Sequence, residues 1–230
     1  MIRFIITCEH GGNRIPPPYR SIFYGQEALL KSHRGYDPGA LTMAKDLAAK
    51  LNALLIVSVT SRLLIDLNRS MGHPHLFSEV TQPLPSAIKQ AIIAKYYEPY
   101  RNRVESAIAE AVACGNSIIH ISSHSFTAIL NGKERFTDIG LLYDPSRSRE
   151  RELCCFWQSK LKENGSELTI RRNYPYLGKA DGLTSYLRRQ FPADRYLGIE
   201  LEINQKHVAM GGTHWQKLRQ RLIRVMSLLP

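Results

Sequence analysis

The stretch Phe4–Pro16, FIITCEHGGNRIP, joins an apolar run to a polar turn. The run stops at Glu9 and His10, and the pair Gly11-Gly12 follows directly. A continuous apolar run bounded by turn residues is typical of a strand that is covered on both faces. In open α/β sheets, binding and catalytic groups gather at the carboxyl ends of such strands. The stretch therefore predicts a buried strand that delivers an acid and an imidazole to the functional edge of a sheet.

The remainder of the chain alternates between strand-like and helix-like segments. The strand-like segments, which are rich in apolar residues, are Ile2–Cys8, Leu54–Val59, Ser117–Ser123, Asp138–Tyr143, Glu167–Arg171 and Tyr196–Ile203. Apolar residues at helical spacing predict helices at Pro38–Leu51, Ser86–Cys114, Arg149–Asn164, Leu183–Phe191 and Thr213–Leu228. Asp37 is the expected N-cap of the first helix, and Pro99 is expected to kink the second. The alternation predicts one α/β domain over residues 1–230, a three-layer sandwich with helices on both faces of a mixed, mostly parallel sheet.

Composition narrows the class of protein. At 43% hydrophobic residues, the 230-residue chain can bury a sizeable core. No apolar run approaches the roughly 20 residues of a membrane span, and the start MIRFIITCEH turns polar too soon for a signal peptide. The four cysteines form no CxxC pair, as expected for free thiols in a reducing compartment. We therefore expect a soluble, cytoplasmic protein without a membrane partner.

The net charge of +11 raises the question of an anionic partner. The basic residues are dispersed along the chain, however. The densest helical run, Lys217–Arg224, carries apolar residues on its other face, which is typical of a solvated helix surface. A nucleic-acid partner is therefore not favoured, whereas a general preference for small anions stays open.

Ionisable residues follow the other predicted strands as well. SRLLIDLNRS (61–70) comes after the second strand, SSHSFT with His124 after the third, and GIELEINQ (198–205) ends the sixth. Because the carboxyl ends of parallel strands meet at one edge of a sheet, these groups are expected to converge. The long segment 62–87 holds little regular structure, and so long a loop in a compact domain is usually functional.

His10 and His124 are candidate ligands of one metal ion, delivered from different strands. A catalytic zinc site generally has three protein ligands of the His, Asp or Glu type. Asp37, His33 and Glu9 are the candidates for the third ligand. The structural alternatives are hydrogen-bonded core histidines and, for Asp37, a role as a helix cap alone.

Glu200 and Glu202 alternate with apolar residues in GIELEINQ, which places both carboxylates on one face of a strand. Burying a carboxylate is costly, so carboxylates on a buried face indicate a function. One near the end of the strand can act as a general base. The alternative is an edge strand with one wet face. In SRLLIDLNRS, Arg62 and Arg69 can bind an anionic substrate, or an arginine can pair with Asp66 to close the turn.

Taken in this order, the motifs CEHGGNRIP, SHRGYDPGA, SRLLIDLNRS, HISSHSFT and GIELEINQ resemble those of the N-formylglutamate amidohydrolase family. The resemblance extends from Ile2 to about Gln205. Relatives of that family include zinc carboxypeptidases and zinc-dependent cell-wall amidases with a phosphorylase/hydrolase-like α/β fold. The resemblance implies a metal-dependent hydrolase of amino-acid metabolism that cleaves the amide C–N bond of a small N-acylated acidic amino acid such as N-formyl-L-glutamate.

The resemblance also implies roles for individual residues. It places one zinc ion on His10, Asp37 and His124 and makes Glu202 the catalytic carboxylate. The residues expected to contact an anionic N-acyl amino acid or peptide substrate are Asn68, Arg69, Arg135, Asn173 and Tyr176, and those expected to support the ligands from behind are Glu9, Asp66 and Ser123. Two alternatives stay open: a zinc amidase or carboxypeptidase acting on a peptide or cell-wall fragment, and a non-catalytic basic protein that binds nucleic acid or another anion on the same scaffold.

Overall fold

A central sheet of six strands organises the computed structural model, which describes residues 1–163 and 167–229. The strands lie in the order β2–β1–β3–β8–β6–β7. Their bounds are β1 (Ile2–Cys8), β2 (Leu54–Val57), β3 (Ser117–Phe126), β6 (Ile139–Leu142), β7 (Ile170–Arg172) and β8 (Tyr196–Asn204). Neighbouring strands run parallel except β6 and β8, which are antiparallel. The prediction of a mixed, mostly parallel sheet is confirmed.

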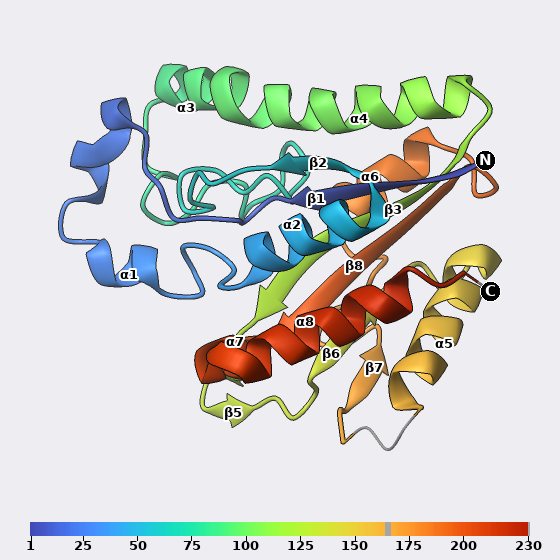
Figure 1. Ribbon diagram of the computed structural model, residues 1–230. Helices are drawn as coiled ribbons and strands as arrows, with labels where there is room; N and C mark the ends of the chain where they lie inside the picture. Colours follow the sequence, from blue (N-terminus) through green and yellow to red (C-terminus); the bar gives the residue numbers. More distant parts are fainter. Residues whose placement is uncertain (164–166, 230) are drawn as a thin grey trace.

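Helices cover both faces of this sheet (Figure 1). One face carries α2 (Ala40–Leu51), α5 (Ser148–Lys162) and α8 (Gly212–Met226), and the other carries α3 (Ser86–Ile92), α4 (Glu98–Ala113) and α6 (Leu183–Gln190). Each face has its own hydrophobic cluster, with Met43 and Trp157 in the first and Ile108 and Leu187 in the second. Successive strand residues point to opposite faces, so the sheet supplies side chains to both clusters. The expected three-layer sandwich is confirmed.

The helices differ from the sequence prediction at several ends, and two of the differences have a clear local cause. Helix α2 begins at Ala40 rather than Pro38, and its cap is Gly39, whose φ of 81° is a backbone conformation that glycine adopts readily. Asp37 is therefore not the side-chain cap of this helix. The expected helix Ser86–Cys114 is interrupted by the π-helical turn η2 (Ile93–Tyr97) just before Pro99, which lacks the amide hydrogen that a regular helix needs there. The predicted end of the third helix at Asn164 lies outside the described residues.

Several short elements were absent from the prediction. They are η1 (Pro17–Phe23), α1 (Glu27–Lys31), α7 (Gln205–Met210) and the hairpin of β4 (Ile129–Leu130) and β5 (Lys133–Glu134). Elements of a few residues give too little periodicity to detect. The long segment after β2 contains turns and one isolated bridge up to Pro85, and it is held by the buried side chains of Leu63, Leu64, Ile65 and Leu67.

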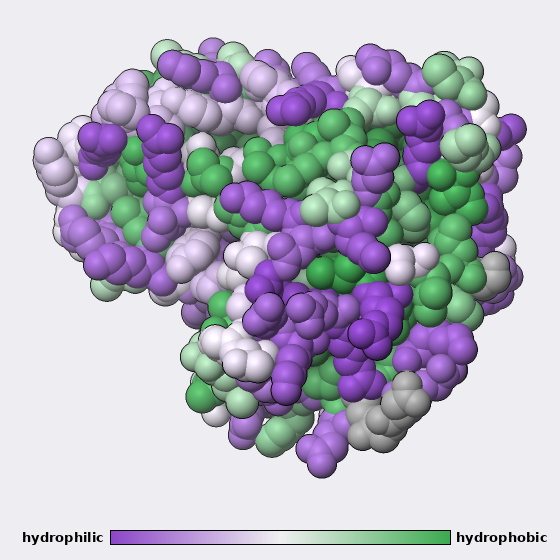
Figure 2. All heavy atoms as spheres, in the orientation of Figure 1, coloured by the Kyte–Doolittle hydropathy of each residue, from purple (hydrophilic) through white to green (hydrophobic). Residues whose placement is uncertain are grey.

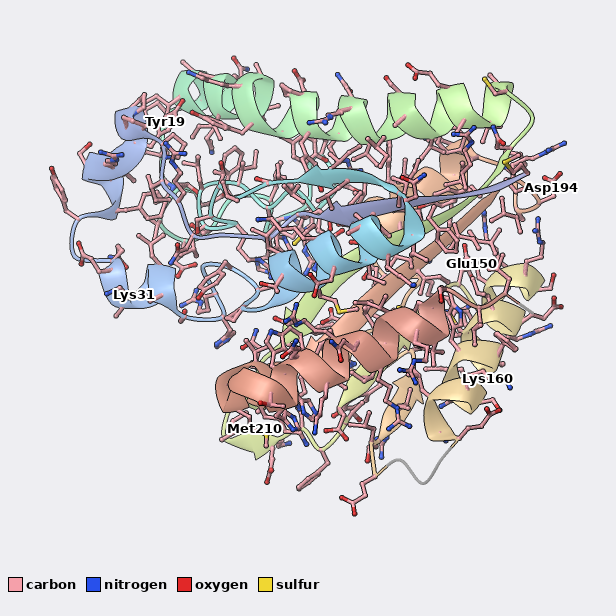
Figure 3. All side chains as sticks on the ribbon, viewed as in Figure 1. Tyr19, Lys31, Glu150, Lys160, Asp194 and Met210 are labelled. Atoms are coloured by element: carbon pink, nitrogen blue, oxygen red, sulfur yellow. The ribbon has the colours of Figure 1, made fainter. Side chains whose placement is uncertain are left out.

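A buried ion pair joins the two helical layers through the sheet. Glu150, labelled in Figure 3, lies in the first turn of α5 and is fully buried. Both of its carboxylate oxygens are 3.1 Å from Nε of Arg188 on α6. The carboxylate also accepts hydrogen bonds from the backbone N–H groups of Gly198 and Asp144, at 2.9 Å each. With its oxygens paired in this way, Glu150 serves the fold.

The edge of the sheet at β2 is partly uncovered. Ile2 and Leu54 are 41% and 46% exposed, and green, apolar atoms are visible in Figure 2 between α4 and α2. A hollow of about 610 Å³ lies there, at the amino ends of β1 and β2. It holds no cluster of histidines and carboxylates among the described residues that line it. Among the described residues, no helix is both long and apolar enough to cross a membrane.

Candidate active site

The carboxyl ends of three adjacent strands supply the polar residues of one cavity. β1 ends just before Glu9 and His10, β3 carries His124, and β8 carries Glu202. In the parallel register His124 lies opposite Glu202, so alternate residues of β3 and β8 project to the same face. The cavity measures about 320 Å³ and is lined by His10, Asp37, Arg62, Asn68, Arg69, His124, Ser125, Tyr176, Leu177, Ala180, Asp181, Glu200 and Glu202.

His10, Asp37 and His124 form a tight buried cluster on the wall of this cavity. One candidate ligand atom from each residue lies within 4.8 Å of the other two. Asp37 Oδ2 is 2.9 Å from Nδ1 of His124 and 3.4 Å from Nδ1 of His10. The backbone explains why Asp37 arrives here, because its N–H donates to the carbonyl of His10 at 2.9 Å. Nδ1 of His10 is buried and has no hydrogen-bond partner among the residues that the structure describes.

Each imidazole is held on its far side by a second carboxylate. Nε2 of His10 is 2.7 Å from Oδ1 of Asp66, and Nε2 of His124 is 3.0 Å from Oε2 of Glu9. Histidines that ligate metals commonly donate their other ring N–H to a carboxylate, which fixes the ring and raises the basicity of the ligand nitrogen. The pattern leaves the two Nδ1 atoms as candidate ligand atoms, and both approach Oδ2 of Asp37.

Attraction between opposite charges in the cluster offsets the cost of burying them. Burial alone would raise the pKa of the Glu9 carboxyl, but hydrogen bonds and charge from His124 hold that pKa well below its usual range. Burial is likewise outweighed at Asp37 and Asp66, whose pKa values are lowered by His10 and Arg62. These three carboxylates are therefore ionised at neutral pH. At His124, burial would lower the pKa, but the carboxylates around the ring raise it well above its usual value.

The donor set fits a divalent transition metal such as zinc. Two imidazole nitrogens and one carboxylate oxygen are the ligand types of catalytic zinc sites, which keep one position open. The buried Nδ1 of His10 is unpartnered, as a nitrogen reserved for a ligand would be. All three residues line the cavity, so the open position would face the space available to a substrate.

Comparison with known proteins identifies the family of this chain. The model of a family described as N-formylglutamate amidohydrolase matches residues 2–209. The chain belongs to the N-formylglutamate amidohydrolase family. The predicted resemblance is therefore confirmed, and the family is one of amidohydrolases.

Two solved structures resemble this amidohydrolase-family chain. The gene product Atu2144 from Agrobacterium tumefaciens shares 30% sequence identity over 97% of this chain and 88% of its own, with a TM-score of 0.83. The N-formylglutamate amidohydrolase from Ralstonia eutropha is 19% identical over 97% of this chain and 91% of its own, with a TM-score of 0.69, and shows the shared fold. No protein among the curated sequences matches.

Glu202, which the resemblance makes the catalytic carboxylate, lines the cavity. Its side chain is buried, its Oε2 has no hydrogen-bond partner in the described ranges 1–163 and 167–229, and burial raises the pKa of the carboxyl to about 8. β8 lies between β3 and β6, so the alternative of an edge strand with one wet face is wrong. Glu200 and Glu202 share the face of β8 that lines the cavity.

The predicted substrate contacts divide into two groups. Asn68, Arg69 and Tyr176 line the cavity. Arg135 lies beside it, with Nη1 3.3 Å from the hydroxyl of Tyr176 and its guanidinium over that ring. Asn173 serves the loop instead, because its Oδ1 accepts hydrogen bonds from backbone N–H groups, 3.0 Å each from Tyr143 and Gly178.

The serine that contacts the imidazole of His124 is Ser122, not Ser123. Ser122 Oγ donates to Oε2 of Glu9 at 2.6 Å and lies 2.9 Å from Nε2 of His124. Ser123 points to the other face of the sheet and donates to the carbonyl of Ala40. The reason is strand parity: residues two apart share a face, so Ser122 and His124 lie together. Ser123 is therefore not a direct support of the cluster, contrary to the expectation.

The sequence did not predict the contacts that three further residues make in the site. Tyr100 on α4 donates to Oε1 of Glu9 at 2.8 Å, and nothing in its sequence context signals this contact. Arg62 lies 3.3 Å from Asp37 and 2.7 Å from Asp66. It is therefore both the structural partner of Asp66 and a residue of the site. Asp181 lines the cavity from the loop before α6, and its Oδ2 accepts the N–H of Ser70.

Proposed function

We propose that this chain is a metal-dependent hydrolase that cleaves the amide C–N bond of a small N-acylated amino acid, with N-formyl-L-glutamate as the reference substrate. The observation that carries the proposal is the buried cluster of His10, Asp37 and His124, whose candidate ligand atoms lie within 4.8 Å of one another. Within it, Nδ1 of His10 has no hydrogen-bond partner among the described residues and lies 3.4 Å from the Asp37 oxygen that Nδ1 of His124 approaches. A polar atom buried without a partner is costly and is therefore rare unless a ligand satisfies it. Membership of an amidohydrolase family supplies the reaction class.

His10, Asp37 and His124 would hold the metal, for which zinc is the best match to the donor set. When bound, such an ion polarises a carbonyl and makes water acidic enough to be a nucleophile near neutral pH. Glu9 and Asp66 orient the two imidazoles from behind, as their contacts with the Nε2 atoms allow.

Glu202 is the group that moves the proton. A carboxyl whose pKa is raised to about 8 lies near the operating pH, where an acid–base catalyst is most effective. In its ionised form the carboxylate can accept a proton from the attacking water at Oε2, which has no hydrogen-bond partner among the described residues, and then pass that proton to the leaving nitrogen. Departure of a neutral amine rather than an amide anion completes the cleavage.

Arg69 is the group that binds the carboxylate of the substrate. It lines the cavity, and a guanidinium can bind a carboxylate through two parallel hydrogen bonds. Asn68 and Tyr176 line the same space and add polar contacts that fix the orientation of the substrate. Orientation of this kind lowers the barrier by holding the amide carbon near the nucleophile.

Metal analysis combined with an activity panel tests the proposal. We expect the purified protein to carry about one zinc per chain by elemental analysis and to release formate from N-formyl-L-glutamate. A parallel panel of dipeptides and cell-wall peptides separates the amidase and carboxypeptidase alternatives. The Glu202→Gln variant should bind zinc but lose turnover. A protein that binds no metal, or a fully active Glu202→Gln variant, would contradict the proposal.

A further inference from the structure

Resting on the metal site of the proposed function, we propose that Tyr100 is a positioning residue for that site. Its hydroxyl holds the carboxylate of Glu9, and that carboxylate fixes which ring nitrogen of His124 carries the proton. Nδ1 of His124 is thereby left as the nitrogen that can bind the metal. Tyr100 itself is buried in α4 and is not among the described residues that line the cavity, so it acts through Glu9.

Hydroxyl groups from two different elements hold the carboxylate of Glu9. The side chain is fully buried; its Oε1 accepts the hydroxyl of Tyr100 on α4 at 2.8 Å, and its Oε2 accepts the hydroxyl of Ser122 on β3 at 2.6 Å. The Tyr100 oxygen also lies 3.3 Å from the carbonyl of Ile56, but its single hydrogen favours the shorter contact with a charged acceptor. Two donors, one at each oxygen, fix the orientation of the carboxylate and keep Oε2 facing the imidazole of His124.

The available donors and acceptors then assign the ring proton of His124. Ser122 has one hydroxyl hydrogen, which it donates to Glu9, so its oxygen can only accept at its 2.9 Å contact with Nε2 of His124. The Glu9 oxygen 3.0 Å from the same Nε2 is also an acceptor. Because both of these partners accept, Nε2 carries the hydrogen. In a neutral imidazole Nδ1 then holds the lone pair, and Nδ1 is the atom that lies 2.9 Å from Oδ2 of Asp37.

The fold places Tyr100 for this contact. The π-helical turn η2 lies immediately before α4, and such turns inside helices are frequent at functional sites. Just after it, the hydroxyls of Tyr97 and Tyr100 both reach the site: they donate to the carbonyl of Arg69 at 2.7 Å and to Oε1 of Glu9 at 2.8 Å. A tyrosine within an apolar cluster needs a partner for its hydroxyl, whereas a phenylalanine would fill nearly the same space without that requirement. The hydroxyl of Tyr100 is therefore explained by its contact with Glu9 rather than by packing.

The zinc affinity of single and double variants tests the inference. Tyr100→Phe removes one oxygen, and we expect it to weaken zinc binding roughly tenfold in competition with a chromogenic chelator, the lower end of the range for groups that orient a metal ligand. Because Tyr100 acts through Glu9, the same substitution should add almost nothing in a Glu9→Gln background. Tyr186→Phe is the matched control, since that hydroxyl donates to Oε2 of Glu105 at 2.7 Å and lies outside the cavity lining. The control should bind zinc as the wild type does.

A measurement on the wild type reads the position of the proton directly. Nuclear magnetic resonance of the zinc-loaded protein, isotope-labelled at the histidine nitrogens, should show a hydrogen on Nε2 of His124 and metal on Nδ1. This spectrum needs no variant, so it can overturn the inference even if Tyr100→Phe fails to fold.

The outcomes separate this inference from the proposed function. If the wild type binds zinc but Tyr100→Phe binds it equally well, the inference is wrong while the proposed function stands. Additive effects of the Tyr100 and Glu9 substitutions, or metal on Nε2 of His124, lead to the same conclusion. If the wild type binds no zinc, the proposed function fails and the inference fails with it.

Discussion

Replacing Asp66 by asparagine should weaken metal binding without unfolding the protein. Oδ1 of Asp66 receives Nε2 of His10 at 2.7 Å and the N–H of Asn68 at 3.0 Å, and Oδ2 receives Nη2 of Arg62 at 2.7 Å. In Asp66→Asn the amide oxygen can keep the first two contacts. The negative charge behind the imidazole is lost, however, and the amide N–H group faces the guanidinium of Arg62, donor against donor.

The size of the effect follows from what these contacts do. Loss of a carboxylate partner behind a ligating histidine typically costs about 10- to 100-fold in metal affinity, which corresponds to roughly 1.4–2.7 kcal/mol. The stability of the metal-free protein should fall as well, by about 1–3 kcal/mol, because a hydrogen bond to a charged group is lost. The two effects are separable because one is measured with zinc and the other without it.

Zinc affinity is measured by competition with a chromogenic chelator, and the stability of the metal-free protein by urea denaturation. Asp144→Asn is the matched control, because within the described part of the chain that carboxylate hydrogen-bonds only to Ser146, and it lies outside the cavity lining. We expect the control to bind zinc as the wild type does. A folded Asp66→Asn protein with wild-type zinc affinity would refute the role of Asp66 in holding His10.

Three further outcomes are expected. Burial lowers the pKa of His120 to about 4, whereas the same side chain in the unfolded chain titrates near ~6.5. The unfolded chain therefore binds the proton first as pH falls, and the free energy of unfolding should fall between pH 6.5 and 4 by up to about 1.4 kcal/mol per pH unit. Urea denaturation at several pH values should show a weaker dependence of stability on pH for His120→Gln. Glu150→Gln breaks the buried pair with Arg188 and should cost about 3–5 kcal/mol in the same assay, whereas the exposed Glu152→Gln should cost almost nothing. Ser122→Ala should weaken zinc binding less than the Asp66 substitution, because the direct carboxylate–imidazole contact survives; an equal or larger loss by chelator competition would contradict this ordering.

Much of the site could be predicted because parallel strands bring their ends together. His10 and His124 are far apart in sequence, yet each follows an apolar run, and the sheet places both runs side by side. The same logic located Glu202 on the next strand. The choice among Asp37, His33 and Glu9 was not decided by pattern. Among the described residues, the structure clusters Asp37 with the two histidines.

What the sequence could not supply depends on register and on contacts between distant segments. Two adjacent serines precede His124, and strand parity selects Ser122 once the inward face is known. Asn173 has a φ of 52°, and its side chain accepts backbone hydrogen bonds within its own loop, which a polar residue in a motif does not reveal. Tyr100 reaches Glu9 from a helix whose packing on the sheet is a tertiary fact.

The buried cluster of carboxylates and imidazoles is a poor way to stabilise a fold. Glu9, Asp37 and Asp66 are buried together with two imidazoles, and desolvation of each ionised group opposes folding. Replacing buried ion pairs by apolar side chains of similar volume is often neutral or stabilising, so stability alone does not account for them. The buried pair of Glu150 and Arg188 differs, because the carboxylate there has both oxygens paired. In the cluster, Nδ1 of His10 and Oε2 of Glu202 remain unpaired beside the cavity. Desolvation of three carboxylates, together with two polar atoms left unsatisfied among the described residues, is the arrangement that the proposed cation site and proton-transferring carboxyl would require.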